Sequence, residues 1–72
     1  MLVVVVYDVS TTDPAGQRRL RKVAKYCVAH GMRVQDSVFE CSVDNAQYIE
    51  MKHYLEQMID GTKDSVRLYN LG

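Results

Sequence analysis

Apolar residues fill the first predicted element without a break, and one acid follows it. Residues 2–7 are a leucine, four valines and a tyrosine, and Asp8 comes directly after them. β-Branched side chains favour extended backbone, and an unbroken apolar run is typical of a strand that is covered on both faces. The pattern therefore predicts a buried strand over residues 2–7 that carries the Asp8 carboxylate at its carboxyl end.

A helical period comes next along the chain. Asp13 can accept hydrogen bonds from the free amides of a first turn, and Pro14 suits the first helical position. Apolar residues recur at helical spacing until Gly31, which can end a helix in a left-handed conformation. These signals predict a first helix over residues 14–30. Its polar face carries the cations Arg18, Arg21, Lys22 and Lys25.

Two short paired strands are predicted after this helix, over residues 32–35 and 38–43, with a polar break between them. In the second strand, Phe39, Cys41 and Val43 alternate with the residues of the other face, which is the two-residue period of a sheet. This alternation indicates that Phe39 belongs to the core.

A second helix and a last strand complete the pattern. Asp44 and Gln47 have the spacing of a capping box, and apolar residues then mark one face of a helix that should end near Gly61. Residues 65–71 read as the last strand.

The predicted order is strand, helix, strand, strand, helix, strand. It is the split pattern of the α+β class known as the ferredoxin-like βαββαβ sandwich. Right-handed crossovers place two helices on one face of a four-stranded antiparallel sheet. The 72 residues make a single domain, residues 1–72. The other sheet face is left bare although its first strand is apolar throughout, so we predict a two-fold homodimer that covers it.

Charge is distributed unevenly along the chain. The formal net charge is zero, yet residues 1–36 carry six basic and three acidic groups, and residues 37–72 carry three basic and six acidic groups. Five of the nine cations fall within residues 17–25. Such a density can engage several phosphates, and it is also found on ordinary solvated helix faces; the residues leave both interpretations open.

The cysteines and the apolar runs indicate where the protein works. Cys27 and Cys41 lie in apolar patterns with no second pair nearby, which argues against a disulfide framework and against a thiolate metal cage. The opening apolar run has no basic leader and is far shorter than the roughly 20 residues that a membrane span needs. We therefore expect a cytoplasmic protein without a membrane partner.

Asp8 is the best candidate for chemistry, but one acid per chain is too few for a hydrolytic metal site. If a dimer axis passes near the end of the first strand, two Asp8 carboxylates converge and can hold Mg²⁺ or Mn²⁺ against a phosphate. In the alternative, Asp8 only ends the strand or caps a turn with Ser10, Thr11 and Thr12. Taken alone, the residues favour the alternative.

Four segments, in this order, resemble the CRISPR-associated protein 2 family over nearly the whole chain. They are Val5-Val6-Tyr7-Asp8-Val9 at the end of the first strand, Arg19-Leu20-Arg21-Lys22-Val23-Ala24-Lys25 in the first helix, Arg33-Val34-Gln35-Asp36-Ser37-Val38-Phe39-Glu40-Cys41 in the hairpin, and Asp64-Ser65-Val66-Arg67-Leu68-Tyr69 in the tail.

The resemblance implies a ferredoxin-like homodimer in which Asp8 and its mate bind a divalent metal, Mg²⁺ or Mn²⁺. Family members are described as metal-dependent endonucleases that act on single-stranded RNA or on double-stranded DNA. The remaining positions carried over are nucleic-acid-binding or linked to activity: Tyr7 before the acid, the arginines Arg19, Arg21 and Arg33, and the hairpin residues Ser37 and Phe39.

The resemblance also implies a partner. Family members bridge the dimers of the CRISPR-associated integrase and hold the spacer duplex, a role that need not involve hydrolysis. The leading hypothesis is thus a metal-dependent endonuclease of CRISPR adaptation, and the alternative is a non-catalytic nucleic-acid scaffold. A third interpretation is a small-molecule regulatory module, or a toxin-type ribonuclease, of similar topology.

Two questions are left open by the sequence. Phosphate contacts carry no base information, so the residues do not choose between RNA and DNA. Family chains commonly continue with a segment that crosses onto the partner subunit, whereas this sequence stops at Gly72. We therefore expect weaker C-terminal contacts within the dimer or with the integrase.

Overall fold

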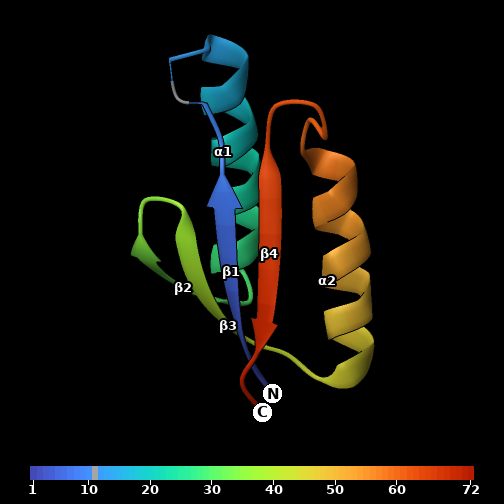
Figure 1. The fold of residues 1–72 in the computed structure, drawn as a ribbon. Helices are drawn as coiled ribbons and strands as arrows, with labels where there is room; N and C mark the ends of the chain where they lie inside the picture. The colour runs from blue at the N-terminus through green and yellow to red at the C-terminus, as the bar shows by residue number, and fades with distance from the viewer. Residues whose placement is uncertain (11) are drawn as a thin grey trace.

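Six elements follow one another in the predicted order in the computed structural model, which describes residues 1–10 and 12–72 (Figure 1). They are β1 (Leu2–Asp8), α1 (Pro14–Val28), β2 (Gly31–Gln35), β3 (Val38–Ser42), α2 (Asn45–Met58) and β4 (Ser65–Asn70). The helix starts agree with the predicted signals. Asp13 accepts a hydrogen bond from the Ala15 amide at 3.0 Å, and Asp44 and Gln47 form the capping box.

Gly31 has a different role from the predicted one. α1 ends at Val28 with Ala29 as its cap in a right-handed conformation, and Gly31 already belongs to β2. A Cβ atom at Gly31 would lie 1.9 Å from the carbonyl oxygen of Glu40 on β3. Glycine is therefore required here because the two strands approach closely, and not because the helix needs a left-handed stop.

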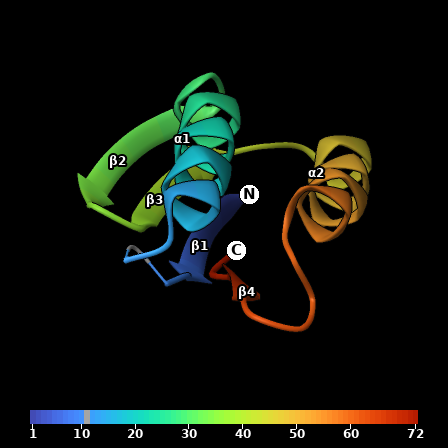
Figure 2. The ribbon, with the colours of Figure 1, turned by 90° about the horizontal axis from the view of Figure 1, so that it is seen from above.

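The sheet has the order β2-β3-β1-β4, with antiparallel pairing throughout. β1 is central, and Val5 pairs with Phe39 on one side and with Leu68 on the other. Both helices lie on the same face of this sheet, as the view along its edge shows (Figure 2). The predicted α+β sandwich is therefore the observed architecture.

The core lies between the sheet and the helices. Alternate residues of β1, namely Val3, Val5 and Tyr7, point into it and are fully buried. Phe39 and Cys41 join them from β3, Val23 and Cys27 from α1, and Met51 and Leu55 from α2. Both cysteines are free thiols in this core.

The second face of β1 is not covered by the chain itself. Leu2 is 40% exposed, Val4 and Val6 are half-buried, and Val38 on neighbouring β3 is half-buried as well. The apolar run predicted a strand that is covered on both faces, with the second face left bare by the chain's own helices; in this chain one face of β1 is buried and the other is open. Neither helix in the described ranges combines the length and hydrophobicity that crossing a membrane requires.

Candidate functional site

Asp8 is the last residue of β1 and lies on the open face of the sheet. It pairs with Ser65, the first residue of β4, and its side chain is exposed. Ser10 and Thr12 share a hydrogen bond of 3.1 Å between their hydroxyls. Within residues 1–10 and 12–72 the Asp8 carboxylate has no hydrogen bond or ion pair, so it does not cap a turn with those two residues. Thr11, the third member of the predicted turn, lies outside the described residues.

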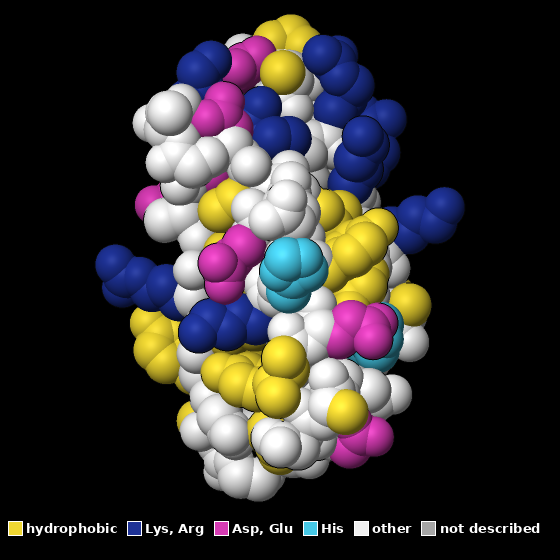
Figure 3. Space-filling view, turned by 90° about the vertical axis from the view of Figure 1, so that its right-hand side faces the viewer, with side chains coloured by type: hydrophobic (Ala, Val, Ile, Leu, Met, Phe, Trp, Pro, Cys, Tyr) yellow, Lys and Arg dark blue, Asp and Glu magenta, His cyan; other side chains and the backbone are white. Residues whose placement is uncertain are grey.

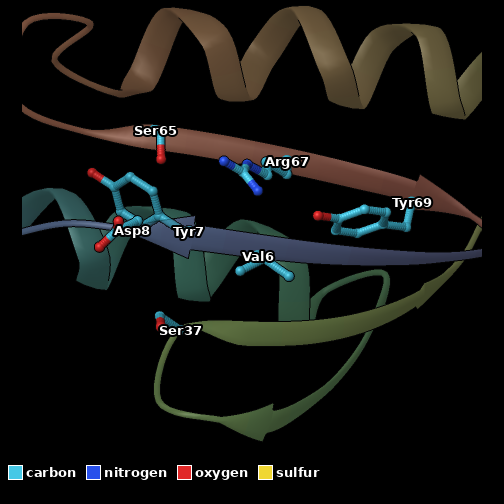
Figure 4. A pocket seen from close by; sticks show the side chains of 7 residues that line it. All are labelled: Val6, Tyr7, Asp8, Ser37, Ser65, Arg67 and Tyr69. Atoms are coloured by element: carbon cyan, nitrogen blue, oxygen red, sulfur yellow. The ribbon is translucent and has the colours of Figure 1, made fainter.

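A hollow of about 290 Å³ surrounds this carboxylate at the end of the sheet. Arg67 lies between Ser65 and Tyr69 along β4, while Asp8 comes from β1 and Ser37 from the turn just before β3 (Figure 4). The hollow thus combines one carboxylate, one guanidinium and several hydroxyl groups. The guanidinium and the hydroxyls of such a set can bind the oxygens of a phosphate. The described residues that line it are Val6, Tyr7, Asp8, Ser37, Ser65, Arg67 and Tyr69.

One chain supplies only some of the ligands that a divalent ion requires. Mg²⁺ takes near-octahedral oxygen ligands, often one or two carboxylates with water and phosphate oxygens. Asp8 fits as one such ligand because its carboxylate is exposed and has no described partner. In the part of the chain that the structure describes, no group of three or more His, Cys, Asp or Glu side chains converges. The remaining ligands would have to come from a second copy, from water or from the nucleic acid.

The exposed cations of α1 form a separate surface. Arg21 lies on it with three neighbours, and these side chains line a shallow hollow of about 270 Å³. Lys and Arg side chains gather at one end of the molecule in the space-filling view (Figure 3). This basic face of α1 consists of Arg18, Arg21, Lys22 and Lys25.

Arg19, in contrast, points into the molecule. Its Nε donates to Oδ2 of Asp64 at 2.7 Å and its Nη2 donates to Oδ1 at 3.1 Å, and the Arg19 side chain is only 16% exposed. Tyr7 donates from its hydroxyl to the same Asp64 Oδ2 at 2.5 Å. The backbone amide of Asp60 donates to that oxygen as well, at 3.1 Å. We call these three side chains, Tyr7, Arg19 and Asp64, the Asp64 cluster.

The charges of the Asp64 cluster are fixed over the neutral range. The Arg19 guanidinium lowers the pKa of Asp64 to about 2, with a smaller contribution from the Tyr7 hydroxyl. Burial, together with the hydrogen bond to Asp64, raises the pKa of Tyr7 to about 12. The bond to Asp64 also raises the pKa of Arg19. The cluster is therefore a buried ion pair with a neutral tyrosine as an additional donor.

The predicted site residues of the hairpin differ in their exposure to solvent. Arg33 donates from Nε and Nη2 to the carbonyl oxygen of Asp36, at 2.8 and 2.5 Å, and its guanidinium lies 5.6 Å from the centre of the Phe39 ring. Arg33 is exposed, whereas Phe39 is fully buried. Ser37 is half-buried, and its carbonyl oxygen accepts from the Tyr7 amide at 2.9 Å.

The structure thus separates the predicted site residues into four groups. Asp8 and Ser37 meet in the hollow, Arg21 and Arg33 are exposed elsewhere, and Arg19 is held in the Asp64 cluster. The remaining two, Tyr7 and Phe39, are fully buried, so a contact with nucleic acid would require their exposure. Sequence reasoning missed Asp64 and Arg67; the only signal for them was their place in the tail segment of the family resemblance.

The whole chain, residues 1–72, matches the family model described as CRISPR associated protein Cas2. The chain belongs to this family. The CRISPR-associated endoribonuclease Cas2 of Nitratidesulfovibrio vulgaris is 57% identical over 72 residues, which are 100% of this chain and 71% of that protein. The CRISPR-associated endonuclease Cas2 of Halalkalibacterium halodurans is 54% identical over 72 residues, 100% of this chain and 75% of that protein.

A solved Cas2 structure agrees with the fold. The crystal structure of Streptococcus pyogenes Cas2 at pH 6.5 matches with a TM-score of 0.96 and 58% sequence identity, covering 100% of this chain and 87% of that chain. The family resemblance and the ferredoxin-like fold predicted from the sequence are therefore both confirmed.

Proposed function

We propose that the protein is a divalent-metal-dependent endonuclease of CRISPR adaptation, working as a homodimer with paired Asp8 carboxylates. The observation that carries the proposal is the exposed Asp8 carboxylate at the end of β1, free of described partners and beside Arg67 and several hydroxyls. Two Cas2 relatives are named as an endoribonuclease and an endonuclease, which supports phosphodiester cleavage as the reaction.

The open sheet face supports the homodimer. Leu2, Val4, Val6 and Val38 form an apolar stripe that leads along β1 and β3 to the end where Asp8 lies. Burying a valine or leucine side chain is worth about 1.5 kcal/mol or more, so covering this stripe with a second copy is favourable. A two-fold axis near the end of β1 would bring two Asp8 side chains together.

Each residue of the hollow has a role in the proposed reaction. The Asp8 carboxylates of two subunits would hold Mg²⁺ or Mn²⁺, which when bound stabilises charge that develops on a phosphate and lowers the pKa of a bound water. The Arg67 guanidinium is suited to bind phosphate oxygens through two parallel hydrogen bonds. The hydroxyls of Ser37 and Ser65 add donors at the edge of the same hollow.

The rest of the nucleic acid would lie along exposed cations. The basic face of α1 and Arg33 on the hairpin supply positive charge for the phosphate backbone. We leave Arg19 out of this set because its side chain is only 16% exposed and its charge is paired with the buried Asp64 carboxylate. We propose that the protein acts in the cytoplasm, where its two cysteine thiols stay reduced.

A metal-dependent nuclease assay tests this function. Matched RNA and DNA substrates, as single strands and as duplexes, are incubated with the protein and Mg²⁺, Mn²⁺ or EDTA. We expect cleavage of at least one substrate with a divalent ion and none with EDTA, because the proposed site has only Asp8 as its acid. Cleavage that EDTA does not reduce would contradict the proposed metal dependence, and the substrate that is cut identifies RNA or DNA.

The basic face of α1 favours a second candidate function, a non-catalytic scaffold that holds nucleic acid for the CRISPR-associated integrase. A scaffold needs the phosphate contacts and does not need the Asp8 carboxylate. In that case, Asp8→Asn would support spacer capture as well as the parent does, while charge reversal at Arg21 would abolish it.

The salt dependence of binding measures the phosphate contacts that both functions share. We expect Arg21→Ala to reduce the slope of log affinity against log salt by about 0.7–0.9, because each neutralised phosphate contributes about that amount. Fluorescence anisotropy at several salt concentrations gives the slope. Lys52→Ala, which removes an exposed cation from α2, is the matched control and should leave the slope unchanged. An unchanged slope for Arg21→Ala would remove the basic face of α1 from the binding surface.

A further inference from the structure

Asp64 has an unusual density of contacts for a residue outside the regular elements. It directly precedes β4, and its side chain is fully buried. Its carboxylate accepts four hydrogen bonds, two from Arg19, one from the Tyr7 hydroxyl and one from the Asp60 amide. A carboxylate offers about four acceptor sites; here Oδ2 accepts three of the bonds and Oδ1 one, all from groups inside the protein.

These bonds join three parts of the fold at one point. Arg19 belongs to α1, Tyr7 to β1, and Asp60 and Asp64 to the connection between α2 and β4. Tyr7 is also held through its backbone, since its amide donates to the carbonyl of Ser37 at 2.9 Å. The end of β1 is therefore fixed from the helix side by a side-chain bond and from the β3 side by a backbone bond.

The two strand ends that carry the Asp64 cluster also carry the candidate site. Tyr7 is followed by Asp8, and Asp64 is followed by Ser65, which pairs with Asp8. Successive side chains of a strand point to opposite faces. Tyr7 is thus bound on the buried face, while its neighbour Asp8 projects into the hollow on the open face.

The energetics of a buried ion pair also indicate that the Asp64 cluster orients the end of β1. Replacing such a pair by apolar residues of similar volume is often neutral or stabilising, because two charges must be taken out of water to form it. What an Arg and an Asp supply here, and apolar side chains do not, is a fixed direction for each hydrogen bond. The Asp64 cluster is suited to hold a strand end in one orientation.

We propose that Asp64 is a positioning residue: its bonds to Tyr7 and to α1 fix the carboxyl end of β1, and with it the Asp8 carboxylate. This inference rests on the proposed function, because it concerns the placement of the proposed metal ligand. It also gives Arg19 a role different from phosphate binding. Catalytic groups must be held within about 0.5 Å of the productive geometry, which a frayed strand end does not provide.

Tyr7→Phe tests this proposal with the smallest change, since it removes one hydroxyl and keeps the buried ring. Cleavage of the substrate that the parent cuts is measured against Mg²⁺ concentration, well below the melting temperature of each protein. We expect the Mg²⁺ concentration for half-maximal cleavage to rise about 10-fold, as happens when an outer partner of a metal ligand is lost. Excess Mg²⁺ should restore most of the rate, and the affinity for nucleic acid should not change.

Two further variants support the measurement. Asp64→Asn keeps the shape of the side chain and removes its charge, and it should raise the required Mg²⁺ concentration at least as much as Tyr7→Phe does. Tyr26→Phe is the matched control: Tyr26 lies on α1, is half-buried, and stacks on Tyr54 with ring centres 4.4 Å apart. It should keep the Mg²⁺ dependence of the parent.

The results separate this inference from the proposed function. If Asp8→Asn is inactive while Tyr7→Phe has the Mg²⁺ dependence and rate of the parent, the positioning role is wrong and the metal site stands. A lower melting temperature of Tyr7→Phe without a change in Mg²⁺ dependence would also overturn it, because the cluster would then serve stability alone. Full activity of Asp8→Asn would overturn the proposed function and the positioning role together.

Discussion

Asp8→Asn is expected to reduce cleavage by about 100-fold or more, because the substitution removes the negative charge that the proposed metal site depends on and metal catalysis is worth several kcal/mol. Asp8 is exposed and Asn has nearly the same size, so the free energy of unfolding should change by less than about 0.5 kcal/mol. Single-turnover cleavage, anisotropy for binding and urea unfolding together give the three quantities.

Asp36→Asn is the matched control for this prediction. Asp36 is an exposed acid in the turn between β2 and β3, and it carries the same charge outside the hollow. We expect its cleavage rate to equal that of the parent. Parent-like cleavage by Asp8→Asn would show that the reaction uses another site, and an equal loss in both variants would show that net charge, and not the metal site, is responsible.

Arg19→Met should lower the free energy of unfolding by about 3–5 kcal/mol, because it leaves Asp64 as a buried charge without its partner. The total for a chain of 72 residues is of the order of 4–11 kcal/mol, so this variant should be close to its folding limit. Urea unfolding measures the difference. Arg21→Met removes the same functional group from the exposed face of α1 and should cost less than about 0.5 kcal/mol. Equal stability of both variants would contradict the burial of the Arg19 bond.

Acid should reveal the same ion pair in the parent protein. The pKa of Asp64 is lowered in the folded state to about 2, from an ordinary value of 3.8. The stability that Asp64 contributes is therefore present above about pH 4 and is lost as the pH falls towards 2. The loss is on the order of 2 kcal/mol. It is smaller than the cost of removing Arg19 because a protonated carboxyl group stays in place and can still form hydrogen bonds. Urea unfolding between pH 5 and pH 2 measures this loss, and the Asp64→Asn variant should not show it.

The order of the elements could be predicted because each element is marked by a pattern of residues that are close in the sequence. The alternation through Phe39 and Cys41 marks a strand with one buried face, and the caps at Asp13 and Asp44 mark helix starts, each within a few residues. Gly31 was misjudged because the reason for that glycine is a carbonyl on another strand, at Glu40. A local pattern does not contain such a contact.

In the candidate site as well, contacts between residues far apart in the sequence could not be predicted. Asp8 could be found because it stands out after an apolar strand, whereas Arg67 enters the hollow only because β4 pairs with β1. Phosphate binding by Arg19 was expected from the family resemblance, which rests on the local sequence around that residue. Its partner Asp64 is 45 residues away, so only the folded chain reveals that the guanidinium is already occupied.

The central claim, that cleavage needs one Asp8 from each of two subunits, can be measured by subunit mixing. Parent protein is mixed with increasing amounts of Asp8→Asn, given time for full subunit exchange, and assayed for cleavage at constant parent concentration with saturating Mg²⁺. If both carboxylates are required, an equal amount of the variant should reduce the activity to about half, and a threefold excess to about a quarter, as random pairing predicts. Activity that stays constant as Asp8→Asn is added, with exchange verified by a tag on one partner, would contradict the shared site.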